Sequence, residues 1–157
     1  MTLRIGVIGT GYLGSRHAEK LSRLEGATLV GVYDLCPERA ANVAVQTGCR
    51  SFPSLEALLG GVDAAVVAVP SGAHAEVTSS VLGAGRSALV EKPLAATLPE
   101  ATALVALARE KAVVLQVGHV ERFNPAFEAA CALVSAPRYL SLIHISEPTR
   151  LRRISYA

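Results

Sequence analysis

Three glycines spaced as G-x-G-x-x-G are the residues with the clearest chemical meaning in this 157-residue chain. They follow the apolar run Leu3–Ile8 directly and precede a helical pattern, which is the context in which this spacing is informative. We expect Gly9 to allow a tight turn, Gly11 to let a pyrophosphate approach the backbone, and Gly14 to let the helix pack on a sheet. The start of that helix would offer unpaired N–H groups to the phosphates.

An acidic residue stands at the distance expected for contact with an adenosine ribose. Asp34 follows a second apolar run, Ala27–Tyr33, twenty residues after Gly14. A carboxylate there can accept hydrogen bonds from both ribose hydroxyls and repels a 2′-phosphate. The pattern predicts NAD as the cofactor and disfavours NADP, although Arg39 is close enough in sequence to soften the preference. A methyltransferase loop for S-adenosylmethionine fits less well, because the glycines are spaced for a pyrophosphate.

Polar residues follow three later apolar runs, at residues 64–69, 87–90 and 113–117. Residues just past buried parallel strands face a ligand bound at the carboxyl ends of the sheet. For His74 the plainer alternative is a ring that caps or packs the start of a helix. The candidate cofactor-binding residues of the whole chain are Gly9, Thr10, Gly11, Tyr12, Leu13, Gly14, Asp34, Pro70, Ser71, His74, Glu91, Lys92, Pro93 and Arg122.

Lys92 is the candidate catalytic residue. Burial in a cleft and a neighbouring nicotinamide cation both disfavour an ammonium group. The amine can then act as a general base for a carbinol proton during hydride removal. The alternative is a surface lysine paired with Glu91. No set of His, Cys, Asp and Glu residues has the spacing of metal ligands, so we expect no metal.

The elements that must position these residues alternate along the chain. Apolar runs predict strands at 3–8, 27–33, 50–52, 64–69, 87–90 and 113–117, and helical patterns cover about 13–24, 38–47, 55–59, 73–82 and 98–111. The last helix should begin at a capping box, Thr97–Glu100, and bury Leu104, Val105, Leu107 and Ala108. Repeated βα units predict an α/β fold with a doubly wound parallel sheet of the Rossmann type, in the order 3-2-1-4-5-6.

Composition excludes several classes of partner. No apolar run reaches the roughly 18 residues of a membrane span. Residues 1–140 carry twelve basic and twelve acidic side chains, which gives no basic surface for nucleic acid. The first strand leaves no room for a signal peptide, and the scattered Cys36, Cys49 and Cys131 fit reduced thiols. We therefore expect a cytoplasmic protein with neither a membrane nor a nucleic acid as partner.

The motifs G-T-G-Y-L-G, A-V-P-S-G-A-H, E-K-P and V-G-H-V-E-R-F-N-P, together with Asp34, resemble the Gfo/Idh/MocA oxidoreductases over roughly residues 3–140. The resemblance implies an NAD(P)-dependent dehydrogenase that transfers a hydride between nicotinamide and a carbinol of a sugar, nucleotide sugar or cyclitol. It implies that Lys92 is the acid/base group. The last motif is most similar to members acting on nucleotide sugars, such as UDP-N-acetylglucosamine 3-dehydrogenases.

The same resemblance divides the chain into three expected parts. Residues 1–118 would form the dinucleotide-binding domain, and residues 119–142 the crossover helix and start of a truncated substrate domain that in the parent enzyme builds a homo-oligomer. Residues 143–157 are expected to be a non-native tail without a role in folding, with a basic docking tail as the alternative. This fragment would then bind cofactor without catalysing the reaction. A non-catalytic dinucleotide-sensing or interaction module on the same fold is the competing hypothesis, because fold alone does not fix function.

Overall fold

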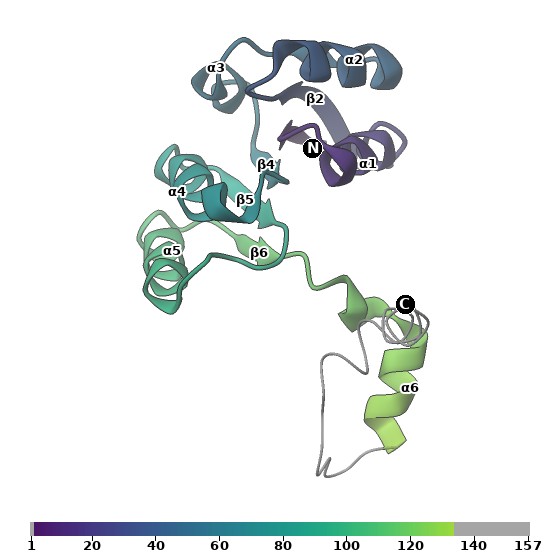
Figure 1. The fold of residues 1–157 in the computed structure, drawn as a ribbon, viewed down its shortest axis with the longest axis vertical. Helices are drawn as coiled ribbons and strands as arrows, with labels where there is room; N and C mark the ends of the chain where they lie inside the picture. Colours follow the sequence, from purple (N-terminus) through teal and green to yellow (C-terminus); the bar gives the residue numbers. More distant parts are fainter. Residues whose placement is uncertain (1, 134–157) are drawn as a thin grey trace, which may run out of the picture. The chain divides into compact units, whose positions relative to one another are not determined.

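Glycines and polar residues cut the apolar runs of this chain into short strands and helices that alternate. The structure is a computed structural model and describes residues 2–133 (Figure 1). Its elements are β1 (Leu3–Ile8), α1 (Tyr12–Leu21), β2 (Ala27–Tyr33), α2 (Pro37–Thr47), β3 (Arg50–Ser51), α3 (Leu55–Leu59), β4 (Ala64–Val67), η1 (Ser71–Ala73), α4 (His74–Gly83), β5 (Ser87–Val90), α5 (Leu98–Glu110), β6 (Leu115–Val117), η2 (Val120–Phe123) and α6 (Pro125–Leu133).

The strands form one six-stranded sheet in the order β3-β2-β1-β4-β5-β6. Every neighbouring pair is parallel, and β1 pairs with β2 on one side and with β4 on the other. This confirms the predicted doubly wound topology. The chain changes direction across the sheet between β1 and β4, so the carboxyl ends of these two strands flank the crevice in which such folds bind ligands.

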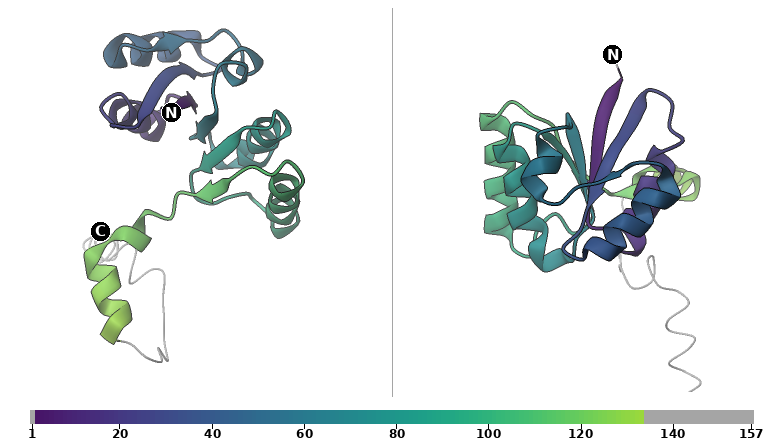
Figure 2. Two further views of the ribbon diagram at one scale, coloured as in Figure 1. Left: turned by 180° about the vertical axis from the view of Figure 1, so that it is seen from behind. Right: turned by 90° about the horizontal axis from the view of Figure 1, so that it is seen from above.

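Helices cover both faces of the sheet, α1 and α2 on one and α3, α4 and α5 on the other (Figure 2). Successive strand side chains point to opposite faces. Val7 accordingly packs in the cluster that includes Ala18 and Val43, and Ile8 packs in the cluster that includes Leu58 and Leu82. This double burial explains why the strands are almost continuously apolar.

The predicted helix starts are confirmed, but one predicted core residue is wrong. Thr97 accepts a hydrogen bond from the Glu100 N–H, and the Glu100 carboxylate accepts one from the Thr97 N–H, as a capping box requires. Leu104 and Ala108 are buried, whereas Val105 is 38% exposed. One residue turns a helix by about 100°, which carries Val105 away from the face that Leu104 shares with Ala108.

The chain divides into two compact units, and the first, Met1–His119, holds the sheet and both apolar clusters. The second begins at Val120 and includes η2 and α6. The predicted boundary between residues 118 and 119 stays a prediction, and the tail predicted at 143–157 lies outside the described residues. Between residues 2 and 133, none of the helices has the length and apolar character needed to cross a membrane.

Candidate functional site

A side chain does not fit at two glycines, one in the loop between β1 and α1 and the other in the first turn of α1. Gly9 has a φ of 86°, and a Cβ there would lie 2.7 Å from the Ala68 carbonyl oxygen. A Cβ on Gly14 would lie 1.7 Å from the Gly9 carbonyl oxygen. The start of α1 is therefore held directly against the chain as it leaves β1 and β4.

Gly11 differs from these two, because no described atom lies within 4 Å of the position that its Cβ would take. Its backbone is in the extended region, which other residues adopt without strain, and it lines a cleft. Glycine is not needed at this position for packing. It leaves the backbone open to the cleft, which is what the close approach of a pyrophosphate requires.

Asp34 follows β2 and is anchored by its own chain. One carboxylate oxygen accepts hydrogen bonds from the Thr10 N–H at 2.7 Å and the Thr10 hydroxyl at 2.9 Å. The other accepts from the Cys36 N–H at 2.8 Å and from the Arg39 guanidinium at 3.0 Å. The Asp34 side chain is 7% exposed, whereas that of Arg39 is 59% exposed. The carboxylate thus joins the glycine loop to the turn after β2.

The charge of Asp34 is stabilised by these contacts. Partial burial acts to raise the pKa of Asp34, but hydrogen bonds from the Cys36 and Thr10 backbone, from the Thr10 hydroxyl, and the charge of Arg39 together hold it below its ordinary value. Asp34 therefore carries its negative charge throughout the neutral range. That charge is the feature that disfavours a 2′-phosphate.

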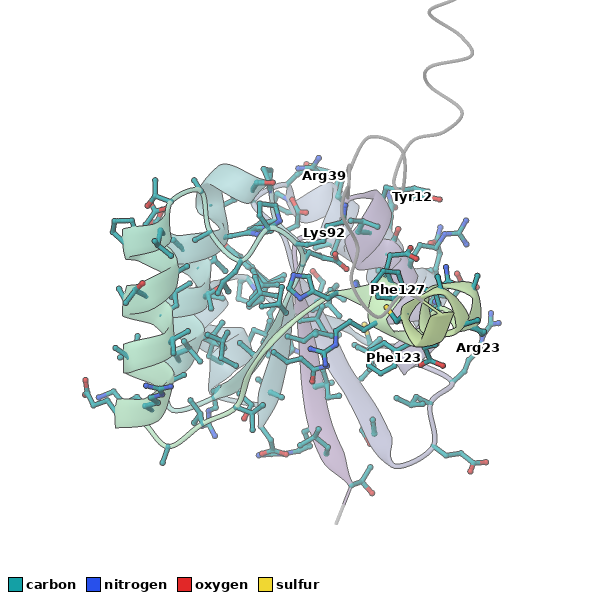
Figure 3. All side chains as sticks on the ribbon, turned by 90° about the horizontal axis from the view of Figure 1, so that it is seen from below. Tyr12, Arg23, Arg39, Lys92, Phe123 and Phe127 are labelled. Atoms are coloured by element: carbon teal, nitrogen blue, oxygen red, sulfur yellow. The ribbon has the colours of Figure 1, made fainter. Side chains whose placement is uncertain are left out.

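A cleft of about 700 Å³ opens beside the glycine loop and Asp34. Its walls combine apolar side chains, on which a flat base can lie, with polar groups. Tyr12, Arg39 and Lys92 project from three separate segments near the carboxyl ends of the strands (Figure 3). The lining residues are Ile8, Gly9, Gly11, Tyr12, Leu13, Tyr33, Asp34, Leu35, Arg39, Leu55, Glu56, Ala68, Val69, Pro70, Ala73, Glu76, Val77 and Ser80.

Six of the residues expected from the sequence to bind cofactor line this cleft: Gly9, Gly11, Tyr12, Leu13, Asp34 and Pro70. Seven others of the first unit lie outside its lining, namely Thr10, Gly14, Ser71, His74, Glu91, Lys92 and Pro93. Arg122 belongs to the second unit. Most of the other lining residues were not predicted from the sequence, because they belong to elements that lie far apart along the chain. Leu35 directly follows Asp34, and this position beside the predicted ribose carboxylate is the signal that could have identified it.

The segment that follows β5 carries Lys92. Lys92 is exposed, so the described residues do not form the partly desolvated cleft expected around it. The Lys92–Pro93 peptide bond is cis. Among the described residues, Lys92 makes no ion pair with Glu91. Lys92 is thus a surface lysine, as the alternative expected, but it lacks the expected pairing with Glu91.

Glu91 is buried and faces α1 instead. Its Oε1 lies 2.7 Å from His17 Nε2, and its other oxygen accepts the Lys92 N–H at 3.3 Å. A Cβ on Gly118 would lie 3.3 Å from the same carboxylate, so this residue leaves room for it. The contact connects the helix of the glycine loop to the segment that carries Lys92.

His74 joins that segment to β4. Its ring is buried, with Nδ1 2.5 Å from the Pro93 carbonyl oxygen and Nε2 2.9 Å from that of Val69. His74 is also the first residue of α4. In residues 2–133, no group of three or more His, Cys, Asp and Glu side chains is arranged to hold a metal ion.

Comparison with known proteins adds evidence from outside the chain. A family model for the Gfo/Idh/MocA oxidoreductases, described as an oxidoreductase family with an NAD-binding Rossmann fold, matches residues 3–119. The UDP-N-acetylglucosamine 3-dehydrogenase of Acidithiobacillus ferrooxidans is 43% identical over 139 residues, which are 88% of this chain and 44% of that protein. Inositol 2-dehydrogenase 3 of Saccharopolyspora erythraea is 38% identical, over 87% of this chain and 41% of that protein.

Solved structures give the same picture. The structure of the UDP-N-acetylglucosamine 3-dehydrogenase GnnA from Acidithiobacillus ferrooxidans aligns with a TM-score of 0.82 at 41% identity, over 88% of this chain and 44% of that one. GenD2 from gentamicin A biosynthesis, solved in complex with NAD, aligns with a TM-score of 0.82 at 34% identity, over 85% and 39% of the two chains. The chain thus spans less than half the length of the relatives it matches.

Proposed function

Because the chain belongs to the Gfo/Idh/MocA family of oxidoreductases with an NAD-binding Rossmann fold, we propose that it supplies the cofactor-binding part of an NAD-dependent dehydrogenase. The substrate of that enzyme is a carbinol of a sugar, a nucleotide sugar or a cyclitol. Among these, a nucleotide sugar has the strongest support, because the 43% identical relative is a UDP-N-acetylglucosamine 3-dehydrogenase.

One arrangement carries the proposal. The glycine loop, Asp34 and the apolar walls border a single cleft at the carboxyl edge of the sheet. Gly11 leaves the space that a pyrophosphate needs, and Asp34 offers a charged acceptor at the ribose end. Lys92 follows β5, which pairs with β4 in parallel, so that it lies at the same edge. These residues fit an NAD molecule whose nicotinamide extends toward Lys92.

The chemistry divides between cofactor and protein. Bound NAD would supply the hydride acceptor. The amine of Lys92 would take the proton of the carbinol hydroxyl as the carbon–hydrogen bond breaks, and would return it when the reaction runs in reverse. The glycine loop and α1 would orient the cofactor through backbone N–H groups. Glu91, held by His17, and His74 would keep the Lys92 segment in place.

The proposal also covers the cellular location, the partners and the oligomeric state of the complete enzyme. Free Cys36, Cys49 and Cys131 favour the cytoplasm, where thiols stay reduced. The balanced charge of residues 1–140 supports a small-molecule substrate in place of a nucleic acid or a membrane. A homo-oligomer is proposed for the full-length enzyme from the family resemblance.

Cofactor binding is tested by Gly11→Val, titrated with NAD alongside the unchanged chain. A Cβ at this position would meet no described atom within 4 Å and the backbone is extended, so the thermal midpoint should stay nearly the same. It would, however, block the pyrophosphate, and we expect at least a tenfold loss of affinity, about 1.4 kcal/mol. Gly83→Val is the matched control, since Gly83 is equally open but lies outside the cleft lining. Equal NAD affinity in both variants would contradict the proposed site.

The reaction is tested by fusing residues 1–133 to the remaining part of the Acidithiobacillus relative, at the matching position. NADH should form when this fusion is given NAD and UDP-N-acetylglucosamine, and myo-inositol is the comparison substrate. A fusion that folds and binds NAD, but reduces it with neither compound, would contradict the dehydrogenase proposal.

A further inference from the structure

His74 is a fully buried imidazole whose two nitrogens both face acceptors. Its side chain is 1% exposed. Nδ1 lies 2.5 Å from the Pro93 carbonyl oxygen, and Nε2 lies 2.9 Å from the Val69 carbonyl oxygen. Both contacts are within hydrogen-bond reach, and the one to Pro93 is shorter than most N–H···O bonds. The ring therefore spans from the end of β4 to the segment that follows β5.

A neutral imidazole cannot make both of these bonds. It carries one N–H donor and one bare nitrogen, and a backbone carbonyl oxygen can only accept. Either neutral tautomer of His74 would thus press a lone pair against a carbonyl oxygen in a site without water access. The doubly protonated ring satisfies both contacts.

We propose that His74 is a positioning residue for Lys92, and that its ring, protonated on both nitrogens, ties the Pro93 carbonyl to the Val69 carbonyl. Pro93 directly follows Lys92, so this tie fixes the backbone from which the lysine side chain extends. The role assigned to Lys92 rests on the proposed function. The charge and the tie of His74 do not.

Burial, the helix dipole and hydrogen bonds together determine whether the His74 ring is protonated. Burial disfavours a cation, and His74 stands at the first residue of α4, where the helix dipole also disfavours one. Two hydrogen bonds from a charged donor to carbonyl oxygens oppose these costs, because charge-assisted bonds are about twice as strong as neutral ones. The titratable groups on the contacting segments and on the neighbouring α5 are Glu76, Glu91, Lys92, Glu100, Arg109 and Glu110.

The tie fixes the backbone that carries Lys92. His74 holds this segment to the chain after β4, and the contact between Glu91 and His17 holds it to α1. A side chain that only filled the space of the His74 ring would leave the Pro93 carbonyl without this hydrogen bond.

The first test observes the ring directly in the unchanged chain. With isotope-labelled histidine, nuclear magnetic resonance near neutral pH should detect a proton on both Nδ1 and Nε2 of His74, and the signals should vanish in His74→Phe. A His74 ring with one proton would overturn the proposal, since one of the two ties would then be missing. This measurement needs neither NAD nor catalysis.

The second test observes Lys92. The chain holds three lysines, Lys20, Lys92 and Lys111, so labelled methyl groups on lysine amines give few signals. His74→Phe should shift the Lys92 signal and leave the other two unchanged, while Ser79→Ala, an exposed change on the same helix, should shift none of them. A Lys92 signal that does not move in folded His74→Phe would overturn the positioning role.

A final comparison keeps this proposal separate from the proposed function. Both chains are also titrated with NAD, whereas the two resonance experiments need no cofactor. If neither chain binds NAD, the proposed function fails, while the two resonance experiments still decide the state of His74. If His74→Phe does not fold, His74→Gln replaces it in both resonance experiments.

Discussion

Asp34 receives four hydrogen bonds from its own chain, so an adenosine ribose must compete for its carboxylate. Arg39 is the partner that leaves at the lowest cost, because it is exposed and surface ion pairs contribute about 0–1 kcal/mol. A ribose hydroxyl can take its place on the same oxygen. The negative charge of Asp34 would instead repel a 2′-phosphate, and only the Arg39 guanidinium would attract it.

This competition predicts how two substitutions change cofactor choice. The unchanged chain should bind NAD more tightly than NADP. Asp34→Asn should narrow that difference, because it removes the charge and keeps an oxygen that can accept the Cys36 N–H. Arg39→Gln should widen it, because the cation nearest to a 2′-phosphate is lost. Titration of all three chains with both cofactors measures the ratios. NADP binding equal to NAD binding in the unchanged chain would show that Asp34 does not set the preference.

Lys92 is predicted to be needed for turnover and not for cofactor binding. In the fusion enzyme, Lys92→Met should lower kcat by about 10²–10⁴, the usual contribution of a positioned acid/base group. The affinity for NAD should change little, because Lys92 does not line the cleft. Lys111→Met is the matched control, since Lys111 pairs with Glu110 at the end of α5. Near-normal turnover of Lys92→Met, with hydride transfer still rate-limiting, would remove the assigned role.

Single residues differ in how far the sequence predicted them. The glycines and Asp34 were predictable because their spacing is local and each has a mechanical reason. The contact between His17 and Glu91 joins residues 74 positions apart, and no local pattern indicates it. The same holds for Val69 and Pro93 as the partners of His74. Side-chain partners of this kind depend on how elements pack, which the pattern of one segment does not contain.

Secondary-structure elements were predicted more completely than residue contacts, because glycines and capping residues mark their ends. Two predicted strands are longer at one end than the observed strands. The strand predicted at 113–117 begins at Leu115, since the Val113 N–H donates to the Ala108 carbonyl at the end of α5. The strand predicted at 64–69 ends at Val67, just before Ala68, which packs against Gly9.

One ion pair between elements predicts a pH dependence of stability. Arg4 of β1 donates to Asp63, just before β4, through its backbone N–H and its guanidinium, with a shortest distance of 2.6 Å. The side-chain and backbone hydrogen bonds from Arg4 lower the pKa of Asp63 to about 2 from an ordinary value of 3.8. A lowered carboxyl pKa stabilises the fold above the ordinary value. That stability is lost as the pH falls from about 4 to about 2.

Asp63→Asn removes this contribution and provides the measurement. Near neutral pH the variant should unfold at a lower denaturant concentration than the unchanged chain. The difference should shrink as the pH is lowered from about 4 and be nearly gone at about pH 2. Asp34 also has a lowered pKa but is present in both chains, so it does not affect the difference. A difference that stays constant down to pH 2 would show that the ion pair is not its source.

At the scale of the whole molecule, the first unit holds everything that the fold needs. Both apolar clusters, all six strands and the complete cleft lie within Met1–His119. The family model ends at the same residue. The sequence predicted the doubly wound sheet because six strands and their crossover helices follow one another along the chain. Helices on both faces bury such an open sheet without a further partner.

A chain shortened to residues 1–119 should therefore fold with nearly the stability of the longer one. We expect the free energies of unfolding to agree within about 1 kcal/mol, since changes outside a packed core have small effects. A larger loss would mean that residues from Val120 onward contribute to the core.

NAD titration of the same shortened chain tests Arg122, the predicted cofactor ligand that the shortening removes. If Arg122 contacts the cofactor, the shortened chain and the full chain with Arg122→Gln should lose NAD affinity by the same factor. A loss in the shortened chain alone would assign the contribution to another residue after His119, and unchanged affinity in both would remove Arg122 from the site.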